Sequence, residues 1–174
     1  MRTLYKDSLV TLHHGDGLGL AVLNPNDHIV VTDPPTELGF PFRREQVAHL
    51  IVHPHYLAHY PTAGLCHVSA WVRPAPGLTR DGWPHAWNAV LHYGQADLTT
   101  DIFWDDAPRV TTHPAERGVA PLVDLISALP DGVILDPFCG SGSVLVAARE
   151  CGRRAVGVEI DAGFAEMARS RLAS

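Results

Sequence analysis

The pattern of apolar and polar positions is most regular in the last third of this 174-residue chain. Short apolar runs alternate there with segments whose apolar residues recur at helical spacing. The pattern predicts helices over 120–130, 141–152 and 162–173, with buried strands over 132–136 and 154–161 between them. Strands that alternate with helices are typical of a parallel α/β sheet covered on both faces.

The first two thirds are less regular but carry further strand-like segments. Apolar runs predict strands over 9–16, 28–35, 64–72 and 86–94, and residues 43–60 show helical spacing that Pro54 interrupts. We expect a short helix or turn over 17–24 and a Pro- and Gly-rich loop over 73–85. Residues 95–118 form an irregular connection that is longer than most loops, which indicates a functional segment.

Composition limits the choice of domain number and compartment. A chain of this length with 46% hydrophobic residues predicts one domain, residues 1–174. No apolar run resembles a signal peptide or a membrane span, so we expect a cytoplasmic protein with no membrane partner. Cys66, Cys139 and Cys151 are odd in number and far apart, which indicates reduced thiols. The formal charge of −6 argues against a strongly basic nucleic-acid coat.

A glycine-rich turn between two of the predicted strands is the most specific signal. One strand ends at Asp136, the turn carries Gly140 and Gly142, a helix follows, and the next strand ends at Glu159. Glycines let a backbone approach a nucleotide-type ligand, and an acid at the second strand end accepts hydrogen bonds from a ribose. Position 145 is Leu rather than the last glycine of a dinucleotide fingerprint. A turn used only for helix packing is the competing interpretation.

The residues DPFCGSG (136–142) resemble the S-adenosylmethionine loop of amino-group DNA methyltransferases. The resemblance extends to Asp33-Pro34-Pro35-Thr36, similar to the family's catalytic DPPY motif, to HPAERG (113–118), similar to its HPxEKP segment, and to Gly15-Asp16. The order, catalytic motif first and cofactor loop last, matches the β group, a circular permutation of the common methyltransferase fold. The resemblance therefore implies a single-domain Rossmann-like methyltransferase with a mixed, mostly parallel sheet.

It also implies S-adenosyl-L-methionine as the cofactor, and it assigns site residues. The implied cofactor-binding residues are Asp16, Asp33, His113, Pro114, Asp136, Pro137, Phe138, Cys139, Gly140, Ser141, Gly142, Glu159 and Ile160. The implied catalytic residues are Asp33, Pro34, Pro35 and Thr36.

A chemical argument, in addition to the family resemblance, supports a catalytic role for the Asp-Pro-Pro stretch. The lone pair of an exocyclic amine is delocalised into the base, so the nitrogen is a poor nucleophile. If Asp33 and the Pro34 carbonyl accept both N–H bonds, the nitrogen can direct its lone pair at a methyl donor. The family places an aromatic at the fourth position to stack on the extruded base, whereas this chain has Thr36. Taken alone, the same stretch is a strand terminator.

Other clusters have competing structural and functional interpretations. Four histidines, His49, His53, His55 and His59, have i, i+4 spacings, but Pro54 interrupts the helix, so we expect structural or surface roles and no metal. Cys139 precedes a predicted helix, which would lower its pKa, yet we interpret it as a small pocket residue. Tryptophans are more often core residues, and only Trp83 and Trp104 lie in loop-like sequence. The candidate substrate-binding residues are Phe40, Phe42, Trp83 and Trp104.

Together these features predict a DNA methyltransferase that modifies adenine N6 in preference to cytosine N4, as in restriction-modification systems. Its short variable segment, 95–112, contains Asp97, Asp101, Asp105 and Asp106 and predicts a short or relaxed recognition sequence, read with the help of a homodimer. The alternatives are methylation of RNA or another planar amine, and an inactive cofactor-binding relative that serves as a partner subunit.

Overall fold

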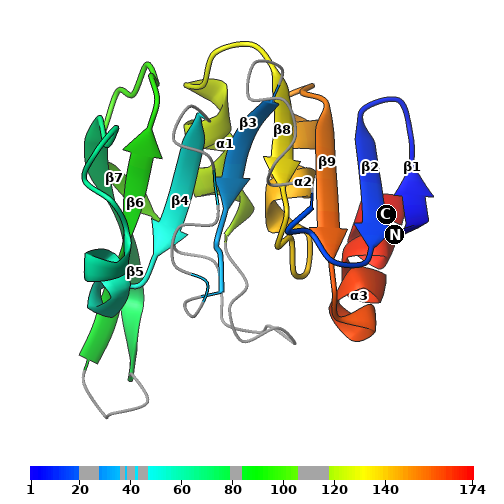
Figure 1. The fold of residues 1–174 in the computed structure, drawn as a ribbon, viewed down its shortest axis with the longest axis horizontal. Coiled ribbons are helices and arrows are strands. Elements are labelled where there is room, and N and C mark those ends of the chain that lie inside the picture. The colour runs from blue at the N-terminus through cyan, green and yellow to red at the C-terminus, as the bar shows by residue number, and fades with distance from the viewer. Residues whose placement is uncertain (20–27, 36–37, 39–41, 43–46, 79–83, 106–117) are drawn as a thin grey trace.

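The computed structural model describes residues 1–19, 28–35, 38, 42, 47–78, 84–105 and 118–174, with the side chains of 74–78 and 84–86 left out. Its centre is a mixed sheet of nine strands in the order β1-β2-β9-β8-β3-β4-β6-β5-β7 (Figure 1). The strands are β1 (Arg2–Lys6), β2 (Val10–His14), β3 (His28–Thr32), β4 (Ala48–Val52), β5 (His67–Leu78), β6 (Pro84–Tyr93), β7 (Ile102–Trp104), β8 (Val133–Asp136) and β9 (Ala155–Glu159). No helix in the described ranges is long and apolar enough to cross a membrane.

Five neighbouring strands, β2, β9, β8, β3 and β4, are parallel and form the middle of the sheet. The last two strands of the chain, β8 and β9, lie between β2 and β3, the second and third strands. The glycine-rich turn follows β8, near the end of the chain. Strands from earlier in the chain must therefore complete the sheet on both sides of β8 and β9.

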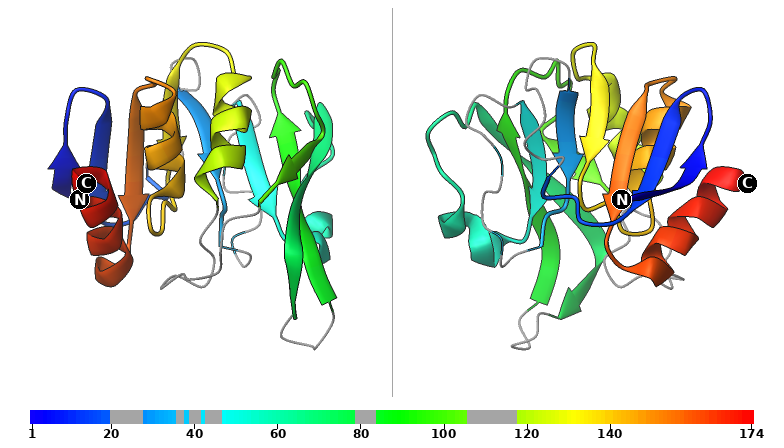
Figure 2. Two further views of the ribbon diagram at one scale, coloured as in Figure 1. Left: turned by 180° about the vertical axis from the view of Figure 1, so that it is seen from behind. Right: turned by 45° about the vertical axis from the view of Figure 1, so that its right-hand side comes forward.

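Three α-helices cover one face: α1 (Val119–Ser127), α2 (Ser143–Glu150) and α3 (Ala162–Ala173) (Figure 2). On this face Val31, Ile51 and Val90 pack with helix residues such as Leu122 and Leu145. Successive strand residues point to opposite faces. Their neighbours, including Val30, Leu50 and Leu91, therefore build a second core, against which the 3₁₀-helix η2 (Pro54–His59) packs through Tyr56 and Leu57. Among the described elements, all three α-helices thus lie on one face of the sheet, and the other face carries only the 3₁₀-helix η2.

The boundaries of α2 and α3 follow from local chemistry. Gly142 begins α2 with a left-handed backbone (φ +84°), and Gly152, also left-handed (φ +67°), follows its end. Asp161 caps α3 by accepting a hydrogen bond from the Phe164 N–H at 2.9 Å.

The helix predicted within 43–60 was wrong for residues 48–52, which form β4. All five residues are buried, because β4 pairs with β3 on one side and β6 on the other. A strand covered on both faces is continuously apolar, so its sequence also satisfies a helical spacing.

The loop predicted over 73–85 was wrong in most of its length, since β5 continues to Leu78 and β6 begins at Pro84. The partner strand β7 ends at Trp104, opposite Val72. Beyond that point no described strand pairs with that side of β5, and prolines, which lack an N–H, are tolerated where no partner needs one. In its described part, the irregular connection 95–118 likewise contains the strand β7, which the sequence pattern did not predict.

Candidate cofactor and catalytic site

Three acidic residues meet at the carboxyl edge of the parallel strands. Asp33 follows β3, Asp136 ends β8 and Glu159 ends β9, and these strands are neighbours in the order β9-β8-β3 (Figure 1). Ligands of open α/β sheets bind at this edge. The sheet thus brings together the predicted catalytic acid and the two predicted cofactor acids.

Asp136 is the buried centre of this group. Its Oδ1 accepts hydrogen bonds from the Thr32 hydroxyl at 2.6 Å and from the Phe138 N–H at 3.2 Å. Burial raises the pKa of Asp136 to about 7, against a lowering by the hydrogen bonds from Thr32 and Phe138; the charges of Glu159 and Asp33 add smaller increases. Carboxylates that disfavour one another's ionisation make a crevice that favours a cationic ligand.

Glu159 holds the glycine-rich loop in addition to its predicted role toward a ribose. Its Oε2 accepts a hydrogen bond from the Gly140 N–H and its Oε1 one from the Asp161 N–H, both at 2.7 Å. A carboxylate oxygen has a further lone pair, so Glu159 can position the loop and still accept a ligand hydroxyl.

The same loop contacts α3, and the sequence pattern did not indicate these contacts. Arg171 donates from Nη1 to the Ser141 carbonyl (3.0 Å), the Ser141 Oγ (3.1 Å) and the Ser143 Oγ (3.2 Å). A Cβ added at Gly142 would lie 3.0 Å from the Ala168 Cβ. Glycine at position 142 therefore allows the left-handed backbone and the close packing of the loop against α3. Both roles are separate from the predicted role of letting a ligand approach the backbone.

Residues that follow β2 and β9 lie beside the glycine-rich loop. The Gly15 N–H donates to the Glu159 carbonyl at 2.9 Å, which places the exposed Asp16 beside the end of β9. Gly17 approaches the loop so closely that a Cβ there would lie 1.9 Å from the Pro137 carbonyl oxygen. Ile160 is 70% exposed, an unusual state for a large apolar residue and one that suits contact with a ligand ring.

The stretch predicted to be catalytic is described as far as Pro35. Pro34 is buried, Pro35 is exposed, and the Pro35 carbonyl accepts a hydrogen bond from the Leu38 N–H at 3.1 Å, which forms a turn. Phe42 is 6% exposed in the second core, so its ring is committed to packing rather than to the predicted contact with a base. The other predicted residues of this region lie outside the described residues: Thr36, Phe40, Trp83, His113 and Pro114.

Cys139 and the four histidines lie in different environments: Cys139 and His49 are buried, whereas His55 and His59 are exposed. Burial raises the pKa of the Cys139 thiol, together with the charges of Asp136 and Glu159, so a lowered value at the helix start was wrong. His49 lies in β4 with its Nδ1 2.9 Å from the His92 Nδ1, while His53 precedes η2. No helix therefore carries the i, i+4 spacing from His49 to His53.

One acidic residue and two tryptophans differ from what the sequence predicts for them. Asp105 is buried and accepts hydrogen bonds from the Trp71 Nε1 (2.9 Å) and the Gly118 N–H (3.2 Å), so it joins β7 to the start of α1 rather than facing DNA. Trp104 lies in β7, not in a loop, and is 60% exposed. Trp87, expected in the core, is 42% exposed.

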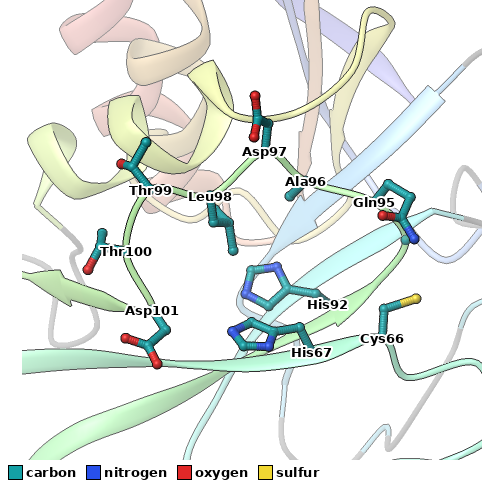
Figure 3. Close-up of a pocket in the computed structure, with 11 residues that line it drawn as sticks. Cys66, His67, His92, Gln95, Ala96, Asp97, Leu98, Thr99, Thr100 and Asp101 are labelled. Atoms are coloured by element: carbon teal, nitrogen blue, oxygen red, sulfur yellow. The ribbon is translucent and has the colours of Figure 1, made fainter.

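The first part of the predicted recognition segment lies away from this site. Ala48, at the amino end of β4, pairs with Tyr93, so residues 94–101 leave β6 at the edge opposite Asp33. They line a hollow of about 540 Å³ together with His67 and His92, whose rings lie side by side in Figure 3. Base reading by this segment would therefore have to come from residues after Asp101.

Comparisons with known proteins agree with this geometry. A 64-residue stretch is 45% identical to the type II methyltransferase M.ScaI of Streptomyces caespitosus and 42% identical to the methylase YubD of Escherichia coli (strain K12). The stretch covers 36% of this chain but only 21% and 28% of those proteins, so the chain matches about a quarter of its curated relatives' length.

Solved structures show the same fold at low identity. The PvuII DNA methyltransferase, described as cytosine-N4-specific, matches with a TM-score of 0.73, 14% identity and coverage of 98% of this chain and 88% of that chain. The complex of M1.HpyAVI with SAM matches with a TM-score of 0.70, 16% identity and coverage of 94% and 99%. A family model of N6/N4 methyltransferases, described as DNA methylase, matches residues 73–170, more than half of the chain. The chain therefore belongs to the N6/N4 family of DNA methylases.

Proposed function

We propose that the protein is an S-adenosylmethionine-dependent DNA methyltransferase that modifies an exocyclic amino group, adenine N6 in preference to cytosine N4. The observation that carries the proposal is the convergence of Asp33, Asp136 and Glu159 at three neighbouring strand ends, joined by the hydrogen bond from Thr32 to Asp136. That bond links the strand of the catalytic acid to the strand of the cofactor loop.

The donor set suits this cofactor. S-adenosylmethionine supplies an activated methyl group and carries positive charge on its sulfonium and amino groups. Asp136 favours such a cation because its own ionisation is otherwise opposed by burial and by Glu159 and Asp33. Glu159 and Asp16 would accept hydrogen bonds from the hydroxyls of a bound nucleoside, and the exposed Ile160 would contact its ring.

The acceptor side rests on Asp33 and Pro34. Asp33 accepts one N–H of the target amine and the Pro34 carbonyl the other, so that the nitrogen's lone pair points toward the cofactor end of the crevice. The preference for adenine follows from Asp rather than Ser before the two prolines, which the family resemblance associates with N6.

Methyl transfer from isotopically labelled S-adenosylmethionine to DNA and RNA, followed by nucleoside mass spectrometry, tests the base, the position and the polymer together. Asp33→Ala should abolish transfer, and Asp131→Asn, an exposed site on the α1–β8 connection, should not change it. Cofactor binding with no transfer to any nucleic acid would instead support the alternative of an inactive partner subunit.

A further inference from the structure

Four large apolar side chains are exposed on one face of β5, β6 and β7. They are Val68 (46% exposed), Trp87 (42%), Ile102 (40%) and Trp104 (60%). In the strand register Val72 lies opposite both Trp87 and Trp104, so these three side chains form a row across the strands, which we call the aromatic row. The intervening Trp71 is buried on the opposite, helix-covered face.

The aromatic row lies at the same edge of the sheet as the catalytic acid. Val52, the last residue of β4, pairs with Ala89, and Trp87 is two residues further toward the carboxyl edge of β4. Asp33 leaves β3 at that edge too. Since neighbouring strands are about 4.8 Å apart, Trp87 lies roughly 10 Å across the sheet from β3.

The chemistry of the row suits bases better than phosphates. None of Trp87, Val72 and Trp104 is charged, so the row offers no charge-assisted contact to phosphates. Stacking of an unpaired base on an aromatic ring needs no charge and contributes roughly 1–3 kcal/mol per base. A paired base has its faces covered by its neighbours and cannot use such a ring.

We propose that the aromatic row stacks unpaired bases beside the target nucleotide, and that the preferred substrate is single-stranded or locally unpaired nucleic acid. This inference rests on the proposed function for the target base itself. Tryptophans are also common in protein interfaces. The continuity of the row with the edge that holds Asp33 favours a nucleotide, because a target base must reach Asp33 across that edge.

The test measures binding separately from methyl transfer. Fluorescence anisotropy of a labelled 20-mer deoxyoligonucleotide, single-stranded or annealed, is recorded with the demethylated cofactor product present. The natural protein should bind the single strand more tightly than the duplex. Trp87→Ala and Trp104→Ala should each weaken single-strand binding about 5- to 150-fold, the equivalent of roughly 1–3 kcal/mol. Val68→Ala, exposed on the same face but nearer the amino edge, should change it less than about twofold.

Three outcomes separate the possibilities. Unchanged single-strand binding in both tryptophan variants, with circular dichroism like that of the natural protein, overturns the inference. So does a dimer in sedimentation that the variants dissociate while oligonucleotide binding stays the same, because the face would then dock a second copy. If binding depends on both tryptophans but no nucleic acid is methylated, the proposed function fails and the inference about the row stands.

Discussion

Arg171 provides a direct test of how α3 supports the cofactor loop. In Arg171→Met the apolar stem is kept and the guanidinium is removed, so the contacts to Ser141 and Ser143 are lost. Ser141 and Ser143 are buried, whereas Arg171 is only partly so. The substitution therefore removes hydrogen bonds without leaving a cavity in the core.

The size of the effect follows from the geometry. One nitrogen, Nη1, carries two hydrogens, so its three contacts count as about two hydrogen bonds. A hydrogen bond to a charged group contributes roughly 1.5–3 kcal/mol, and partial exposure of Arg171 reduces this, so we take about 2 kcal/mol for the pair. If the loop then leaves its binding conformation, the free energy of cofactor binding weakens by at most about 2 kcal/mol. This corresponds to a loss of affinity of about 30-fold.

The assay is calorimetry with S-adenosylmethionine combined with steady-state kinetics. We expect Kd and the KM for the cofactor to rise about 10- to 30-fold, while kcat at saturating cofactor changes little, because bound cofactor restores the loop. Arg171→Lys should recover part of the affinity, since one ammonium can reach only some of the three acceptors.

The matched control is Arg169→Met on the same helix. Arg169 forms an exposed pair with Glu166 three residues away, an arrangement that contributes little. We expect its binding constants to equal those of the natural protein. Equal affinity in Arg171→Met would refute the reasoning, as would a large loss of kcat at saturation.

Three further predictions follow from the site. First, cofactor binding near pH 6.5 should release a proton, because a bound cation lowers the raised pKa of Asp136, and cofactor affinity should therefore increase from pH 6 to 8. Calorimetry in buffers of different ionisation enthalpy measures this proton release, which should be absent in Asp136→Asn. Second, Gly142→Ala should lower the free energy of unfolding more than Gly152→Ala, by roughly 1 kcal/mol or more, since both have positive φ but only a Cβ at 142 meets a neighbour; equal losses in chemical denaturation would contradict this. Third, Thr36→Tyr should raise methyl-transfer rates about 5- to 150-fold by adding a stacking face, and an unchanged rate would show that no base reaches that position.

Much of the cofactor half could be predicted from sequence because its signals are local. Gly142 precedes the helix from Ser143 with a left-handed backbone, which glycine adopts without steric cost. The apolar runs that end at Asp136 and Glu159 are bounded by turn residues, so their strands and the acids at their ends were confirmed. Local chemistry also indicated that Asp33 would end a strand.

The errors came where burial depends on partners distant in sequence. Residues 48–52 became a strand because β3 and β6 lie on either side, which no property of those five residues indicates. Trp87 is exposed because the described elements on that face, η2 among them, do not cover it, although its sequence resembles a core strand.

The sequence by itself determined the order of strands and helices at the end of the chain, the acids at three strand ends and the glycines of the cofactor loop. Each of these depends on the backbone preferences of a few consecutive residues. Only the tertiary structure decided which side chains hold that loop and tune its acids. The contact from Arg171 to Ser141 spans 30 positions and that from Thr32 to Asp136 spans 104. Such pairs form because strand order and helix packing bring distant segments together, and no local pattern of residues encodes that arrangement.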